Sequence, residues 1–301
     1  MSERTLKRIL MALAVALVVY SVLGIVQRVR RGSSGGGAGF ARVLQSIDTA
    51  AVRAILLRGP TDSLALERAG SGWTVNGYES DPEAVTRFLR ALASSDVAGV
   101  AANNPANHER LGVAGPDAWT LRLETVDGHP YEIILGKTGT RFGTAFARLP
   151  GEDAVVSLVG DLRPSTVRSL DQWRNKNVAA VDTARVATIQ VETGSGGYTL
   201  NRDASAWTLG AATADSFTVA TVLGEISRIS ATGFPTPSEE PAGERRTLVA
   251  IANEGDTLLA LEGWVAPETF VVRRAGSGTL YELSQWRGDR MMPPPDSLRP
   301  R

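Results

Sequence analysis

The chain has 301 residues, no cysteine, and 32 basic against 32 acidic side chains. The absence of cysteine excludes disulfides, thiolate metal ligands and cysteine nucleophiles, and formal neutrality excludes an overall positive field of the kind that attracts nucleic acid. Hydrophobic residues make up 43% and charged residues 21%, a globular composition that predicts a sizeable core in one or two domains.

Residues 9–26 form an apolar stretch without a charge. As a helix it would be about 27 Å long, against roughly 30 Å of bilayer hydrocarbon. A cleaved secretory signal is the alternative, favoured by the basic residues that precede the stretch. Its length, and the arginines that follow before any small-residue cleavage site, favour a retained anchor. We therefore predict a transmembrane anchor with basic flanks over residues 1–31, its short amino end in the cytoplasm.

A tether and lead-in segment follows over residues 32–47. Its first part, residues 32–39, is rich in glycine and serine and predicts a flexible tether. Its second part has apolar residues at helical spacing, which indicates either a short lead-in helix or a segment lying on the surface. These apolar residues are Phe40, Val43, Leu44 and Ile47.

Two long stretches of the chain share one pattern at a constant offset. Trp207 lies 134 positions after Trp73, and Asp215 lies 134 positions after Asp81. In each copy an alternating apolar strand leads to a strand with the tryptophan, and the aspartate then caps an amphipathic helix. We predict an internal duplication, with a first α+β repeat at residues 48–181 and a second at residues 182–290.

The two predicted helices keep the same apolar positions although most other residues differ. The shared spacing of i, i+3, i+4 and i+7 predicts one buried face on each helix. The positions are Val85, Phe88, Leu89 and Leu92 in the first copy, and Val219, Val222, Leu223 and Ile226 in the second. We expect Leu89 and Leu223 to be equivalent core residues.

The fold class expected is α+β: an N-terminal transmembrane helix, then two tandem repeats, each a mostly antiparallel β-sheet backed by one principal α-helix. Alternation and turn residues predict the strands of the first repeat, and a helix is expected over residues 161–170. The strands are expected over residues 52–58, 63–68, 73–75, 119–125, 131–135, 144–148 and 155–159. The tail, residues 291–301, is proline-rich and is expected to be disordered.

Further motifs complete the pattern. The first copy contains Leu111-Gly112-Val113, Pro116, Leu121, Leu123, Asp127-Gly128, Ile134 and Leu135-Gly136, and ends in Trp173-Arg174-Asn175-Lys176. The second copy repeats part of this block, with Gly263 matched to Gly136, and ends in Trp286-Arg287. Together with the capped helix, the block resembles the domain of unknown function 4340 family over about residues 48–286. The resemblance implies a bacterial membrane-anchored envelope protein, in some members beside ABC-type export or gliding-motility components, without agreed catalytic residues.

The Gly-Lys-Thr motif and the two histidines are of types that often bind phosphate or metal, but in this sequence a structural role explains them better. Gly136-Lys137-Thr138 lacks the upstream glycine and the following helix of a phosphate-binding loop, and is interpreted as a hairpin turn. The only histidines, His108 and His129, have no partner at metal-ligand spacing and are expected in exposed loops. No catalytic residue, cofactor or metal is therefore predicted.

Tryptophans remain the candidates for contacts with other proteins, because tryptophan is enriched in protein interfaces. Trp73 and Trp207 occupy equivalent positions, which favours core packing. The tryptophans and arginines that end the two units either join strands or present a stacking surface, and Trp264 is expected to be exposed. The candidate partner-contact residues are Trp173, Arg174, Trp264, Trp286 and Arg287.

The expected function is that of a non-catalytic accessory or scaffold component of an envelope transport assembly, with an ABC-type assembly as one option. Its soluble part is expected on the periplasmic side of the bacterial inner membrane, with protein partners and no nucleic acid. This expectation comes from the family resemblance. An envelope glycan- or lipid-binding sensor module is the alternative, and the absence of an acid/base constellation disfavours a hydrolase.

Overall fold

A computed structural model describes residues 36–204, 206–235 and 241–299. These residues form two compact units that divide between Asn175 and Lys176. Residues 176–181, which we assigned to the first repeat, thus belong to the second unit. Among the described residues no helix has the length and hydropathy to cross a bilayer, and the predicted anchor over residues 9–26 lies outside them.

The first unit contains a nine-stranded antiparallel sheet in the order β4-β3-β2-β1-β6-β7-β8-β9-β5. Short turns such as Asp127-Gly128, where Gly128 has a φ of 81°, reverse the chain between neighbouring strands. The strands are β1 (Val52–Arg58), β2 (Ser63–Ala69), β3 (Gly72–Val75), β4 (Tyr78–Glu79), β5 (Asp96–Ala102), β6 (Trp119–Thr125), β7 (Pro130–Thr138), β8 (Thr144–Arg148) and β9 (Val155–Val159).

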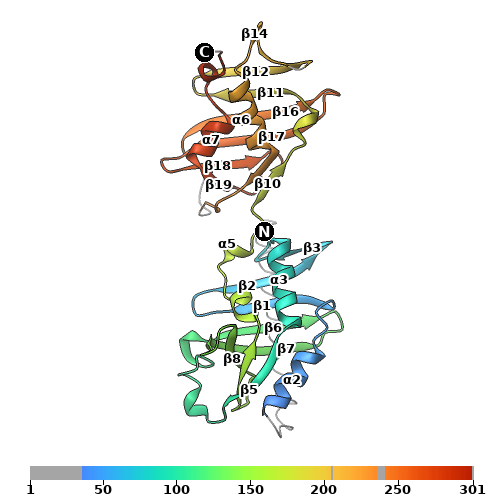
Figure 1. Ribbon diagram of the computed structural model, residues 1–301, viewed down its shortest axis with the longest axis vertical. Helices are drawn as coiled ribbons and strands as arrows, with labels where there is room; N and C mark the ends of the chain where they lie inside the picture. The colour runs from blue at the N-terminus through green and yellow to red at the C-terminus, as the bar shows by residue number, and fades with distance from the viewer. Residues whose placement is uncertain (1–35, 205, 236–240, 300–301) are drawn as a thin grey trace, which may run out of the picture. The chain divides into compact units, whose positions relative to one another are not determined.

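The principal helix of the first unit, α3 (Pro82–Ala93), covers one face of this sheet (Figure 1). Asp81 begins the helix, since its carboxylate accepts a 2.9 Å hydrogen bond from the amide of Glu83 and Pro82 fits the first helical position. The other helices are α2 (Gly36–Ser46), α4 (Leu162–Thr166) and α5 (Leu170–Trp173), with 3-10 turns η1 (Pro105–Asn107) and η2 (Gly115–Asp117).

Helix α2 corrects the prediction of a flexible tether up to residue 39. The glycine-rich residues 36–39 form its first turn, and Phe40 is buried in the core of the first unit. Burial of the phenyl ring offsets the poor helix propensity of the glycines. The interpretation of residues 40–47 as a lead-in helix is confirmed through Ser46.

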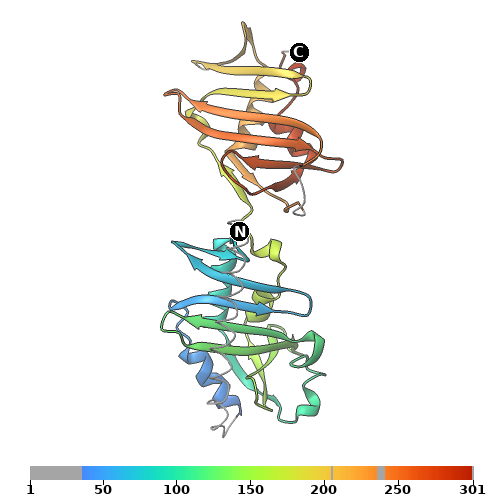
Figure 2. The ribbon, with the colours of Figure 1, turned by 180° about the vertical axis from the view of Figure 1, so that it is seen from behind.

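The second unit contains an eight-stranded antiparallel sheet in the order β14-β13-β12-β11-β16-β17-β18-β19, and a two-stranded sheet of β10 and β15. Figure 2 shows the face of each large sheet that lies opposite its principal helix. The elements are β10 (Asn177–Ala180), η3 (Thr183–Arg185), β11 (Val186–Thr193), β12 (Gly196–Asp203), β13 (Ala206–Leu209), β14 (Ala212–Thr213), α6 (Ser216–Ser227), β15 (Arg228–Ser230), β16 (Glu244–Ala252), β17 (Thr257–Val265), β18 (Thr269–Arg274), β19 (Tyr281–Ser284), α7 (Gln285–Met291) and η4 (Pro295–Leu298).

The two large sheets correspond strand by strand in order from β4 to β9 and from β14 to β19. They also share an irregularity. The pairing of β1 with β6 shifts register between Val52 and Ala54, and the pairing of β11 with β16 shifts between Val186 and Thr188. Helices α3 and α6 cover equivalent faces of their own sheets. Val85 shares a core with Ile55 and Leu66, and Val219 shares a core with Ile189 and Leu200, the strand residues 134 positions later.

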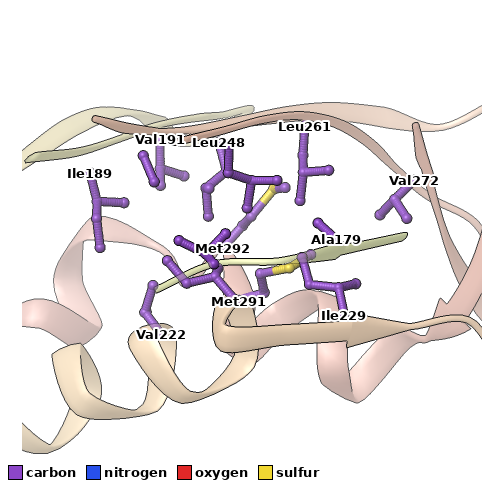
Figure 3. Close-up of a cluster of buried hydrophobic side chains, with 14 of the residues drawn as sticks. Ala179, Ile189, Val191, Val222, Ile229, Leu248, Leu261, Val272, Met291 and Met292 are labelled. Carbon is purple, nitrogen blue, oxygen red and sulfur yellow. The ribbon is translucent and has the colours of Figure 1, made fainter. Parts of the chain in front are cut away.

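The C-terminal tail packs, contrary to the expectation of disorder. Met291, Met292 and Leu298 are fully buried in the core of the second unit. Figure 3 shows both methionines between the side chains of the large sheet and those of Val222 and Ile229. The carbonyl of Leu298 also accepts a 2.8 Å hydrogen bond from the amide of Asp215, the residue that caps α6.

Two elements of the first unit differ from the sequence expectation. Strand β5 was not among the expected strands, and the helix expected over residues 161–170 is divided. Helix α4 ends at Thr166, and α5 begins only at Leu170, where Ser169 and Gln172 form a capping box. The new N-terminus turns the chain so that Trp173 enters the core.

Candidate functional site

Trp173, a predicted contact residue, is buried in the core of the first unit. Its side chain is 0% exposed, and its ring meets that of Phe88 edge-on at 5.8 Å and 66°. The neighbouring Arg174 places its guanidinium 3.9 Å from the centre of the Tyr78 ring. Trp173 is therefore a packing residue, and the prediction that it contacts partners is wrong.

The motif that begins at Trp173 connects the two units. The carbonyl of Trp173 accepts a hydrogen bond from the amide of Asp81 at 2.8 Å, and the amide of Asn175 donates to the carbonyl of Glu79 at 2.9 Å. The next residue, Lys176, instead accepts at its carbonyl a 2.8 Å hydrogen bond from the amide of Ala231 in the second unit. The motif thus has a structural role, fastening the chain on each side of the division.

Trp286 belongs to the corresponding motif of the second unit but is 63% exposed. It lies in the first turn of α7, which Ser284 caps through a hydrogen bond to the amide of Arg287. The core that Trp173 fills in the first unit is filled here by Met291 and Met292 from the end of α7. With those methionines inside, the tryptophan at the start of the helix faces outward.

Arg287 fixes α7 against the end of α6. Its Nε donates to Oε2 of Glu225 at 2.8 Å, and its Nη1 donates to the carbonyl of Ser230 at 3.0 Å. Its Nη2 donates to the carbonyl of Arg228, just past the last helical residue. A cation at a helix C-terminus satisfies free carbonyls and complements the helix dipole. Arg287 therefore orients the surface that carries Trp286.

Arg290 completes this surface. Its guanidinium lies 4.3 Å from the centre of the Trp286 ring, and its Nε lies 3.0 Å from Oε1 of Glu225. One carboxylate thus pairs with two arginines, Arg287 and Arg290. Sequence reasoning selected Trp286 and Arg287 but missed Arg290 and Glu225. The i, i+4 spacing of Trp286 and Arg290 was the available signal.

Trp264 was expected to be exposed and is 6% exposed instead. The register of the sheets explains its position. Leu121 pairs with Ile133 in the first unit, and Leu248 pairs with Leu261 in the second. Gly136 lies three residues after Ile133, and the residue three positions after Leu261 is Trp264. Trp264, not Gly263, therefore corresponds to Gly136. An irregularity in the pairing of β16 with β17 accounts for the difference of one residue.

Gly136 is small because another segment packs on it. A Cβ atom there would lie 2.4 Å from the carbonyl oxygen of Leu111. That oxygen accepts a 2.9 Å hydrogen bond from the amide of Lys137, and Arg148 Nε donates to the carbonyl of Val113 at 2.9 Å. Burial lowers the pKa of the Arg148 guanidinium. These contacts hold the Leu111-Gly112-Val113 segment against the sheet, and we call this segment the clasp.

The prediction of a hairpin turn at residues 136–138 is wrong, because these residues form the end of β7.

In the second unit an ionic cluster surrounds Trp264. Arg273 lies over its ring at 5.2 Å and donates to Glu262 through Nε at 2.9 Å. Arg245 also donates to Glu262, and these hydrogen bonds lower the pKa of its carboxyl. A carboxylate with a depressed pKa stabilises the fold at neutral pH, and that contribution is lost as the pH falls through the depressed value.

The two histidines lie in different environments. His129 is exposed as predicted, with 74% of its side chain accessible. His108 is 8% exposed, and its Nε2 lies 2.9 Å from the carbonyl oxygen of Asp153. The expectation that His108 lies in a solvated loop is wrong, because residues distant in the sequence enclose it. Within the described part of the chain no group of three or more histidine, aspartate or glutamate side chains is arranged to hold a metal ion.

Comparison with known proteins adds one relationship. Neither the curated proteins nor the solved structures give a significant match to the chain. The sequence model described as domain of unknown function (DUF4340) matches residues 73–245, more than half of the chain. The matched region runs from Trp73 in β3 through the clasp and the connecting motif to the start of β16. The chain belongs to the domain of unknown function 4340 family.

Proposed function

We propose that this protein is a non-catalytic, membrane-anchored component of the bacterial envelope and that it serves a transport assembly, such as an ABC-type one, as an accessory or scaffold protein. In this proposal it binds protein partners through the second unit. The observation that carries the proposal is the exposed Trp286 on α7. Tryptophan and arginine are both among the residue types most enriched in the few residues that dominate protein interfaces. The contacts of Arg287 and Glu225 hold this pair in place before any partner arrives.

The finer architecture belongs to the same proposal. We infer that the two units arose by internal duplication, supported by the common strand order and by register shifts at Val52/Ala54 and Val186/Thr188. The test is to determine structures of other family members and to superpose the two units of each member by their large sheets. Members in which the two principal helices cover opposite faces of their sheets would contradict it.

The membrane anchor over residues 9–26 is also proposed. A reporter active only in the cytoplasm, fused after Arg301, is expected to be inactive, since the soluble part is assigned to the periplasm. A reporter of periplasmic activity at the same place serves as the matched control. Activity of the cytoplasmic reporter reverses the orientation, and a mature N-terminus near Gly39 identifies a cleaved signal instead.

Partner binding is tested by purifying the tagged full chain from membranes in three forms: wild type, Trp286→Ala and Phe217→Ala. Phe217 is a second exposed aromatic residue of the same unit and serves as the control. Proteins recovered with the wild type and with Phe217→Ala, but lost with Trp286→Ala, support the proposal. Identical recovery with all three forms removes Trp286 from the interface. Recovery of a glycan or lipid without protein favours a sensor module.

A further inference from the structure

Arg290 lies on the exposed side of α7 between an aromatic ring and a carboxylate. Its guanidinium is 4.3 Å from the centre of the Trp286 ring, and its Nε is 3.0 Å from Oε1 of Glu225. The side chain as a whole is 41% exposed, whereas its Nε atom is buried, and the Nε–Glu225 contact is an ion pair without hydrogen-bond geometry. Among the described residues, no oxygen accepts a hydrogen bond from its two terminal nitrogens. Arg290 therefore has donor capacity that the folded unit does not use.

The carboxylate that holds Arg290 is itself held. Glu225 Oε2 accepts from Nε of Arg287 at 2.8 Å, and Arg287 also donates to the carbonyl of Ser230 at 3.0 Å. This series of contacts connects the backbone at the end of α6 to Arg287, then to Glu225, and finally to Arg290. A guanidinium fixed in this way loses little conformational entropy on binding a ligand.

The charges around this surface leave positive charge in excess. Arg287 and Arg290 share the single carboxylate of Glu225, and Arg228, whose side chain is exposed, adjoins them at the end of α6. The acidic residue on α7, Asp289, pairs with Arg246 instead. An incoming carboxylate would therefore meet complementary charge beside the exposed Trp286 ring.

We infer that Arg290, supported by Trp286, binds a carboxylate in an acidic segment of a partner protein. The inference deepens the proposed function and rests on it. A guanidinium over an aromatic ring can offer two parallel N–H donors to one carboxylate, a geometry that lysine cannot reproduce. The indole beside it provides an apolar surface for a neighbouring side chain of the same segment.

The test places a photo-crosslinking amino acid at Gln285, an exposed position next to Trp286, in the full chain in its native membranes. Mass spectrometry of the adduct identifies the partner segment. The expected result is an aspartate- or glutamate-rich peptide, with an adduct yield about tenfold lower in Arg290→Lys. Phe217→Ala, the matched control, is expected to leave the yield unchanged. Arg290→Lys keeps a positive charge beside Glu225, and an unchanged melting curve is required to show that the unit remains folded.

The alternative outcomes separate the two proposals. A protein adduct whose segment lacks acidic residues, or whose yield is the same in Arg290→Lys, overturns the carboxylate inference and leaves partner binding intact. A phospholipid adduct in place of a protein also overturns it and assigns the surface to the membrane. The absence of any protein adduct, with the crosslinker active, contradicts partner binding at Trp286 altogether.

Discussion

The first unit buries the tryptophan of its closing motif, and the second unit exposes it. Trp173 packs against Phe88 in the core, whereas Trp286 faces outward while Met291 and Met292 fill the second core. At the position of Phe88 the second unit has the smaller Val222. One pattern of strands and helices thus supports two solutions for its core. The same Trp-Arg motif therefore packs in the core of the first unit and forms part of the exposed surface of the second.

The two units also differ in what covers the sheet at the position of Gly136 in the first unit and Trp264 in the second. The first unit covers Gly136 with the Leu111 segment, which Arg148 holds through a carbonyl. The sequence of the second unit lacks the Leu-Gly-Val motif, and Trp264 lies at that position, with Arg273 over its ring. At this position a backbone segment covers the sheet in the first unit, and the side chains of Trp264 and Arg273 cover it in the second.

Ending the chain after Arg290 should produce the largest effect. It removes Met291, Met292 and Leu298 from the second core, and each methionine alone is worth about 2–5 kcal/mol against a typical domain stability of about 5–15 kcal/mol. The second unit is expected to lose its fold while the first, closed by Trp173, keeps it. Limited proteolysis with mass spectrometry measures this. A chain ending after Arg299 is the control, and two protease-resistant units in the shorter chain would contradict the assignment.

Phe88→Ala should destabilise the first unit by about 3–5 kcal/mol, because it leaves a cavity beside Trp173. The matched Val222→Ala should cost the second unit about 2 kcal/mol, since it removes two methyl groups. Leu89, expected to be a full core residue, is half-buried, so Leu89→Ala should fall at or below the lower end of about 2–5 kcal/mol. Denaturant unfolding measures all three. A larger loss for Val222→Ala than for Phe88→Ala would contradict the comparison of the cores.

Gly136→Ala tests the clasp. The added methyl group would meet the carbonyl of Leu111, and overpacking of this kind costs about 1–3 kcal/mol. The control is Gly224→Ala in α6, where a Cβ meets no atom within 4 Å and is expected to stabilise the helix by about 0.5–1 kcal/mol. Thermal unfolding distinguishes the two signs. An equal gain from Gly136→Ala would show that the clasp is not tightly packed.

His108→Ala should destabilise the first unit by about 0.5–1.5 kcal/mol, because the buried imidazole and its hydrogen bond to the carbonyl of Asp153 are lost. His129→Ala, at an exposed position, should change stability little. Urea titration of both variants measures the difference. Equal stability of the two would mean that water replaces the histidine at Asp153.

Tyr198→Phe should produce the smallest effect, with the opposite sign. The phenol oxygen of Tyr198 is buried without a hydrogen-bond partner among the described residues, and burial raises its pKa. Leu64 occupies the corresponding position of the first unit and is also buried. Removing the hydroxyl should therefore stabilise the second unit by about 1 kcal/mol, measured by thermal unfolding. A destabilisation would reveal a bound water at the phenol.

The sequence by itself determined the elements that depend on neighbours along the chain. The caps at Asp81 and Asp215 and the strands with alternating burial lie where they were predicted, and so do the apolar faces of α3 and α6, except that Leu89 and Leu223 are only partly buried. Caps and periodic faces arise from residues within a few positions of one another, so a single sequence records them directly.

Only the tertiary structure decided which side chains are buried at the ends and on the outer faces. His108 lies against the carbonyl of a residue 45 positions away, and Leu298 bonds to the residue that begins α6. The position of Trp264 depends on a register shift between β16 and β17. The exposure of Trp286 likewise follows from the methionines that enter the core behind it. Each outcome depends on contacts between segments far apart in the chain, where packing density rather than local spacing selects the residue that fits.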